Sequence, residues 1–158
     1  MTSSIVPGPI SAGAWVAIQK GTGACDITSI PTGFKVLRLE ILGNSTGTAI
    51  TLKLNNDAGA NYYWNMVDDG MSHSESDTSA TIAVGLGGAY LYQATFDIVN
   101  IAAANKMITG ISGQYIGGVT HNNTIPFSAT WKNATNEINR ITVSGSTPVF
   151  WVLLGCSL

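Results

Sequence analysis

A run of carboxylates in the middle of the chain is the best candidate for a chemical site. Five of the nine acidic residues fall within residues 57–77, and no Lys or Arg lies within residues 54–105. Clustered carboxylates supply the hard oxygen ligands that a divalent cation prefers, and such a cation could bridge two subunits. The candidate metal ligands are Asp68, Asp69, Glu75 and Asp77. The favoured alternative is a solvated acidic loop that keeps a charge-poor protein in solution; an unchanged melting curve in chelator would remove the metal.

Groups for nucleophilic or acid–base catalysis are scarce. His73 and His121 are the only two histidines, and both lie in polar segments that we interpret as loops. We expect no activated nucleophile, because neither a Cys–His neighbourhood nor a nucleophile elbow is indicated. Any two acids can meet in space as a glycosidase pair does, but none lies in a context that would raise its pKa. The sequence therefore predicts a protein that is not an enzyme, with no catalytic residues.

The stretch Asn55-Asn56-Asp57-Ala58-Gly59-Ala60 separates two apolar runs. An EF-hand calcium loop needs alternating oxygen ligands and a closing Glu, whereas Asp57 is the only carboxylate in this stretch. Asn, Asp and Gly tolerate positive φ, as the turn of a β-hairpin requires. We therefore expect this stretch to turn the chain between two strands.

Cys25 and Cys156 are the only cysteines, and their spacing does not indicate a zinc site. First and last strands are often neighbours in β-sandwiches, so a disulfide between them is one possibility. Two buried free thiols are the favoured alternative.

Aromatic side chains could line a sugar-binding face, because their rings stack on the C–H surfaces of pyranoses. Most of them lie in alternating segments where one ring of each neighbouring pair must point into the core, so core packing is favoured. Tyr63, between Tyr62 and Trp64, is the ring most expected to face outward. The others considered are Tyr90, Tyr92, Tyr115, Trp131 and Trp151.

The composition narrows the class of protein. Only 10% of the 158 residues are charged, against about 25% in an ordinary soluble domain, and 45% are apolar. A net charge of −2 with scattered Lys and Arg argues against a nucleic-acid partner. The N-terminus lacks the features of a signal peptide. Residues 78–96 are uncharged, but three Gly and several polar side chains make them a poor membrane span, and we expect no membrane partner.

Apolar residues recur with a period of two, which indicates strands. The pattern runs through residues 34–42, 50–54, 62–66, 96–98, 108–116, 140–143 and 149–154. Residues 99–108 and 131–141 are the only helical candidates, and we interpret both as loops that adjoin strands. The sequence predicts an all-β protein: an antiparallel β-sandwich, jelly-roll-like, over residues 14–158, with a short extended N-terminal arm over residues 1–13 that contains Pro7-Gly8-Pro9.

Three segments carry a resemblance by their order and spacing. Residues 37–64 give a strand, a polar turn, and a second strand that ends in an Asn-rich turn followed by Asn-Tyr. Residues 96–115 give a strand, a short loop, a Lys and a strand, and residues 129–156 give a Trp, a connector, an Ile-x-x-Ile strand and a final apolar strand. Together they resemble a β-sandwich module of tailed-bacteriophage virion proteins, both capsid decoration proteins and tail-associated proteins. The chain departs from that pattern at Asn56, where the module tends to have Gly, and in residues 150–155.

The resemblance implies a non-enzymatic structural protein located in the virion. We expect it to decorate and cement the capsid as a homo-oligomer, with the major capsid protein or other virion proteins as partners and a trimer as the expected form. The alternative is a tail-associated or receptor-binding domain that recognises a host-surface glycan. No cofactor is expected beyond the possible divalent cation.

Overall fold

The computed structural model describes residues 2–4, 13–45, 48–68, 71–83, 90–115 and 122–157, without the side chains of residues 2–4, 68, 71–76, 83, 122 and 123. In these ranges the chain forms thirteen strands and no helix. The strands are β1 (Thr2–Ser4), β2 (Trp15–Gly21), β3 (Cys25–Ile27), β4 (Val36–Ser45), β5 (Ile50–Leu54), β6 (Tyr62–Asp68), β7 (Met71–Asp77), β8 (Ala80–Ala83), β9 (Leu91–Val99), β10 (Lys106–Tyr115), β11 (Asn122–Trp131), β12 (Ile141–Ser144) and β13 (Ser146–Cys156).

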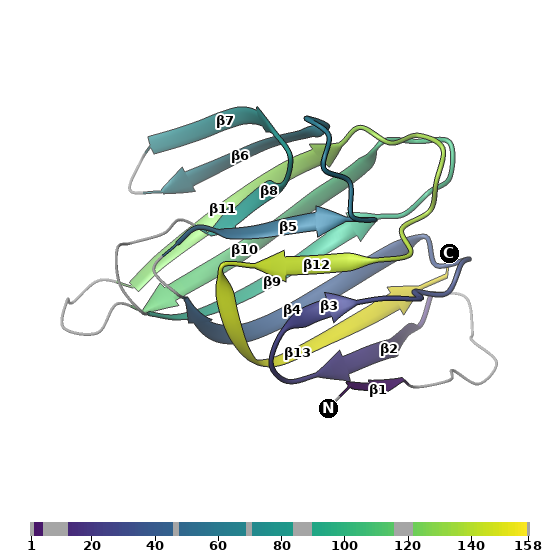
Figure 1. Ribbon diagram of the computed structural model, residues 1–158, viewed down its shortest axis with the longest axis horizontal. Coiled ribbons are helices and arrows are strands. Elements are labelled where there is room, and N and C mark those ends of the chain that lie inside the picture. The colour runs from purple at the N-terminus through teal and green to yellow at the C-terminus, as the bar shows by residue number, and fades with distance from the viewer. Residues whose placement is uncertain are drawn as a thin grey trace.

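Two antiparallel sheets of unequal size form the sandwich. In the described part of the chain, the large sheet has the order β1-β2-β13-β4-β9-β10-β11-β6-β7 and the small sheet has the order β3-β12-β5-β8. Figure 1 shows β3, β12 and β5 lying across the large sheet. The chain passes back and forth between the sheets, as expected for a jelly-roll-like sandwich. The predicted fold class is therefore confirmed.

Period-two alternation sends one set of side chains from each sheet into a shared core. Leu37, Leu39 and Ile41 of β4 are buried, and so are Leu52 and Leu54 of β5 in the opposite sheet. These side chains belong to one continuous cluster of buried apolar residues that draws on both sheets. The core is thus the layer between the large and small sheets.

Strand β11 is the main element that the periodicity did not identify. It contains Pro126, and proline in a strand removes a ladder donor, which argues against a central position. The structure resolves the conflict because the pairing of β11 with β6 extends only from Trp131 to Phe127. Pro126 therefore lies just beyond that ladder while still opposing Ile111 of β10.

The first described residues of the predicted N-terminal arm pair with the sheet. Strand β1 is extended and lies antiparallel to β2, with Thr2 opposite Gly21 and Ser4 opposite Gln19. Residues 5–12 of the predicted arm lie outside the described residues. The beginning of the arm is thus the edge strand of the large sheet (Figure 1).

The Asn55–Ala60 stretch turns the chain, as predicted, but it does not close a hairpin. Asn55 and Asn56 have φ values of 50° and 56°, in the left-handed region that Asn tolerates. The hairpin expectation is wrong because β5 belongs to the small sheet and β6 to the large sheet. The turn therefore carries the chain from one layer of the sandwich to the other.

The two segments with some helical character and the two cysteines also have defined positions in the structure. The segments between β9 and β10 and between β11 and β12 are loops rather than helices. Cys25 in the small sheet and Cys156 in the large sheet are both buried free thiols, so the favoured alternative to a disulfide is confirmed. Burial, with a smaller contribution from the neighbouring Asp26 carboxylate, raises the pKa of Cys25 to about 12.

Candidate interaction surface

The acidic run forms part of a hairpin rather than a loop. Residues 71–77 are strand β7, paired with β6, so that interpretation of the segment is corrected. Asp69 and the side chains of Asp68 and Glu75 lie outside the described residues. The register places Asp77 beside Tyr62, six positions and about 20 Å from Asp68 at the other end of the hairpin. Asp68 and Asp77 therefore cannot bind the same ion. A metal ion bound by the other candidate ligands stays a prediction.

In the described residues, no three His, Cys, Asp or Glu side chains gather as metal ligands would. The described side chain of Asp77 instead accepts hydrogen bonds from the amide and the hydroxyl of Thr78. This is a local turn contact that shapes the start of the connection to β8.

The structure does not describe the side chains of the two candidate catalytic histidines. His121 and the side chain of His73 lie outside the described residues. Residues 43–47 match the Gly-x-Ser-x-Gly spacing, but a nucleophile elbow places its Ser on a turn between a strand and a helix. Ser45 is instead buried at the end of β4, where its hydroxyl lies 3.5 Å from the Thr48 carbonyl oxygen. The geometry here is that of a strand end.

The most distinctive feature of the described surface is the face of the large sheet that points away from the small sheet, here called the outer face. Its residues alternate with the core residues of the same strands. Of the eleven large apolar side chains that are exposed in the described part of the chain, only Ile101 and Val149 lie in a turn or an irregular position. The nine on the outer face are Trp15, Leu42, Tyr63, Val67, Leu91, Met107, Ile111, Tyr115 and Phe150.

Strand register makes the central part of this set continuous. Phe150 opposes Leu42 across β13 and β4, and Leu91 opposes Tyr115 across β9 and β10. Leu42 and Tyr115 in turn line one common hollow. Large apolar patches on soluble proteins mark interaction sites, so this face is the candidate functional site.

The outer face carries charges of both signs, with Lys20 and the Lys132 ammonium in addition to the Arg38–Asp97 pair. The Arg38 guanidinium donates to both carboxylate oxygens of Asp97, at 2.7 and 2.9 Å, and its carbon lies 4.5 Å from the Trp15 ring centroid. Glu40 lies two residues along the same strand. The hydrogen bond to Asp97 raises the pKa of Arg38, so the guanidinium keeps its positive charge beside the carboxylate.

The exposed face of the small sheet has a different character. Asp26, Thr142 and Lys53 form one cross-strand row, and Arg140 donates to both oxygens of Asp26 at 2.8 and 2.7 Å. This hydrogen bonding is the main cause of the lowered pKa of Asp26. The two faces of the sandwich therefore differ: the small sheet presents polar and charged side chains, whereas the outer face carries nine of the exposed large apolar side chains.

Two of the hollows that indent the outer face are lined by an exposed tyrosine. One, of about 220 Å³, lies over Gly113 and is lined by Leu42, Leu91, Gln93, Tyr115 and Thr124, among others. A Cβ added at Gly113 would meet no atom within 4 Å, so the missing side chain itself helps to create the depression. The other, of about 250 Å³, is lined by apolar Met107 and Tyr63 together with polar side chains of β6, β10 and β11.

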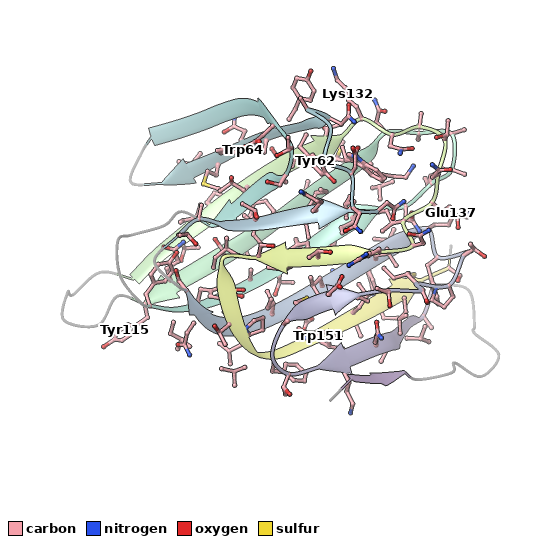
Figure 2. All side chains as sticks on the ribbon, in the orientation of Figure 1. Tyr62, Trp64, Tyr115, Lys132, Glu137 and Trp151 are labelled. Carbon is pink, nitrogen blue, oxygen red and sulfur yellow. The ribbon has the colours of Figure 1, made fainter. Side chains whose placement is uncertain are left out.

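The predicted orientations of the aromatic side chains are confirmed, except that Tyr115 is exposed rather than packed in the core. Tyr63 is 42% exposed, whereas Tyr62 and Trp64 on either side of it are buried. The Lys132 ammonium lies 3.9 Å from the Tyr63 ring centroid. Tyr90, Tyr92, Trp131 and Trp151 are buried, but Tyr115 is 55% exposed. Figure 2 shows Tyr115 pointing away from the body of the molecule.

A polar network fixes one end of the sandwich. The Asp57 carboxylate accepts hydrogen bonds from Trp131 Nε1 at 2.6 Å, Asn61 Nδ2 at 2.9 Å and the Gly59 amide at 2.9 Å. The Trp131 hydrogen bond is the main cause that lowers the pKa of Asp57, and burial opposes it. The Trp131 ring also stacks on Tyr62. Asp57 is thus a structural acceptor that no sequence motif indicated.

Lys106 lies at the same end of the sandwich, and its burial was not expected from the sequence. Its side chain is fully buried, and its ammonium donates to the carbonyl oxygens of Ile101, Ala104 and Asn133 at 2.9, 2.6 and 3.1 Å. Burial lowers the pKa of Lys106, while the Glu137 charge opposes that shift. Three donors meeting three carbonyls tie the β9–β10 turn to the loop after β11. The role of this cation is structural.

Comparison of the chain with protein-family models, with curated proteins and with solved structures finds no match. In the described residues there is also no helix of the length and apolarity needed to cross a membrane.

Proposed function

We propose that this protein is a non-enzymatic structural protein of a tailed-bacteriophage virion that decorates and cements the capsid as a homo-oligomer. The observation that carries the proposal is the outer face, which presents nine exposed large apolar side chains and pairs Arg38 with Asp97. A surface of this kind gains free energy by leaving water against another protein. Association, rather than turnover of a substrate, is what this geometry favours.

The use of the described charged groups supports the same conclusion. Arg140 is engaged with Asp26, Lys106 with three carbonyl oxygens, and Asp57 with Trp131. Each of these contacts stabilises a strand or a turn. Charged groups committed in this way stabilise a scaffold, which is what a cementing protein requires.

Attachment to the shell is expected to use the N-terminal segment. Residues 1–13 include the edge strand β1 and the Pro7-Gly8-Pro9 sequence, and each copy in an oligomer presents one such segment. Several weak contacts made together raise the effective affinity without any single strong interface. Each oligomer would thus hold several capsid subunits at once.

Deletion of residues 2–10 tests this attachment. The truncated protein should keep the far-UV circular dichroism of a β-sandwich, because among the strands that the structure describes it loses only the three-residue edge strand β1. It should no longer co-sediment with purified capsids that the full chain decorates. Undiminished decoration by the folded truncated protein would contradict the role of the segment.

Copy number per particle tests the location. Quantitative mass spectrometry of intact virions should find hundreds of copies if the protein covers the shell. A few copies per particle would contradict capsid decoration and favour the tail.

A tail-associated, glycan-binding role is the second candidate, and the Tyr63 hollow favours it. Tyr63 is exposed beside Ser128, Thr130 and Thr109, so an aromatic ring and hydroxyl groups share one depression. Rings and hydroxyls together are what a sugar requires. A glycan array in which Tyr63→Ala abolishes a signal seen with the full chain would favour this role over decoration.

A further inference from the structure

We propose that the outer face of the large sheet packs against the same face of a second copy, so that the protein forms a two-fold symmetric dimer. The partner surface is then a second large sheet, and two sandwiches stack into four layers. Sheets that stack face to face lie about 10 Å apart and bury the side chains between them. The inference concerns the chain alone and does not depend on attachment to a capsid.

The apolar area of the outer face is sufficient for such a contact. Its nine large apolar side chains are each between 37% and 55% exposed. At these exposures each offers on the order of 80 Å² and the set roughly 700 Å², close to the about 800 Å² per partner of a standard interface. Intervening Thr, Ser and Gln side chains add polar area to this sum.

Charge favours a second copy over a charged partner. Arg38 and Asp97 neutralise each other within the face, and the other charges on it, Glu40, Lys20 and the Lys132 ammonium over Tyr63, are of both signs, so no extended field of one sign selects an oppositely charged surface. The exposed face of the small sheet, with Asp26, Arg140 and Lys53, is suited to remain in water. Self-association through the outer face therefore leaves the charged side chains of the small sheet in water.

The shape of the face is self-complementary. Tyr115 projects from it, and the Gly113 hollow lies next to that ring, lined by Leu42 and Leu91. A two-fold axis that relates the two faces can place the Tyr115 ring of each copy in the hollow of the other. One projection and one depression on the same surface are then both satisfied.

The symmetry that follows differs from the trimer expected above. A contact of one face with itself is isologous, and it closes with two copies. A ring of three needs two different surfaces that meet head to tail. The outer face alone therefore gives a dimer, and any larger oligomer requires a second contact elsewhere.

Sedimentation equilibrium of the full chain, over micromolar to hundred-micromolar concentrations, tests the proposal. We expect a reversible monomer–dimer equilibrium, with a dimer of twice the 16.5 kDa chain mass. A protein that stays monomeric over this range, or one that assembles only as a trimer, would overturn it.

Gly113→Val tests the interface itself. The added side chain meets no atom within 4 Å in the monomer, so it should fill the hollow without disturbing the fold. Valine also suits a strand better than glycine, so the free energy of unfolding of the monomer should not fall. The dimer dissociation constant should nevertheless rise by roughly tenfold or more, as at an interface hot spot. Unchanged dimerisation would count against the proposal.

Ile111→Glu and Leu91→Glu provide independent variants on β10 and β9. Each should also weaken the dimer by roughly tenfold or more, because it buries like charges across the two-fold axis. Ile101→Glu is the matched control, because Ile101 is similarly exposed but lies in the β9–β10 turn off the outer face. Equal weakening by all three variants would contradict the assigned face. Circular dichroism verifies that each variant is folded.

Discussion

At the scale of single residues, one carboxylate organises the turn between the two layers. Asp57 follows two Asn residues with positive φ, and its oxygens accept hydrogen bonds from its own turn and from Trp131 of β11. The turn is thereby attached to the strand that it lies over. Without that acceptor, the partly buried indole N–H of Trp131 would lose its hydrogen bond.

We predict that Asp57→Asn lowers the free energy of unfolding by about 1–3 kcal/mol, because a charged acceptor of three hydrogen bonds is replaced by a neutral amide. Urea unfolding followed by tryptophan fluorescence measures the change. Glu40→Gln is the control, because it removes an outer-face carboxylate that accepts no side-chain hydrogen bond in the described residues. An equal loss in both variants would contradict the assigned role.

The same residue predicts a dependence on pH. The pKa of Asp57 is lowered in the folded state, so its stabilisation is fully present above the unfolded value of about 3.9 and is lost as the pH falls through the folded value. The free energy of unfolding should therefore decrease below about pH 4. Asp57→Asn should make that decrease shallower without abolishing it, because the pKa of Asp26 is also lowered. An unchanged acid slope in the variant would exclude this contribution.

At the scale of elements, the turn that joins β9 to β10 is held by a buried cation. Lys106 begins β10 and reaches back to Ile101 and Ala104, while Ala103 between them has a φ of 62°. Asn100, also buried, donates to the Phe34 carbonyl oxygen at 3.0 Å and accepts from the Ile138 amide at 2.7 Å. Side chains thus supply the partners of loop backbone groups that no strand can pair.

We predict that Lys106→Met destabilises the protein by about 2–4 kcal/mol, because three carbonyl oxygens lose their donor at a buried position. Lys20→Met, at an exposed position of β2, is the matched control and should change stability by less than about 0.5 kcal/mol. Denaturant unfolding of both variants measures the difference. Similar small effects would mean that the carbonyl oxygens find other partners.

Strand β10 offers a second test, with two glycines on opposite faces. A Cβ at Gly110 would lie 2.8 Å from Phe127 Cζ and also against Phe96, whereas Gly113 has open space. We predict that Gly110→Ala destabilises by about 1–3 kcal/mol through overpacking. Gly113→Ala should be neutral or stabilising by up to about 1 kcal/mol. Thermal unfolding of the pair, at concentrations where the chain is monomeric, distinguishes them.

At the scale of the whole molecule, two layers enclose one core, and the Cys25 thiol lies within it. Cys25 comes from the small sheet and Cys156 from the large sheet, and both are free. Burial raises the pKa of Cys25 to about 12, so very little reactive thiolate forms at neutral pH. Access of reagent to Cys25 therefore reports opening of the sandwich.

We predict that both thiols resist a thiol-specific reagent in the native protein and react fully in denaturant. Reducing agent should leave the melting temperature unchanged, because no disulfide links the layers. Time-resolved labelling at rising urea concentration measures this, and the unfolded chain is the control. Labelling of the native protein at the rate of an exposed cysteine would contradict the burial of both thiols.

The sequence by itself determined the class of fold and part of the side-chain orientation. Period-two alternation places Leu37, Leu39 and Ile41 on one face of a strand whichever strand lies beside it. The same rule directs Tyr63 away from Tyr62 and Trp64. These conclusions were predictable because they depend on local geometry alone.

Only the tertiary structure decided which strands pair and which apolar residues remain in water. The Asn55 turn joins different sheets, and β13 lies between β2 and β4, because pairing depends on contacts between distant segments. Met107 and Ile111 resemble core residues in type, yet they are exposed because the small sheet covers only the other face of β10. The outer face exists because, among the strands that the structure describes, a sheet of nine is covered on one side by a sheet of four, which no local pattern encodes.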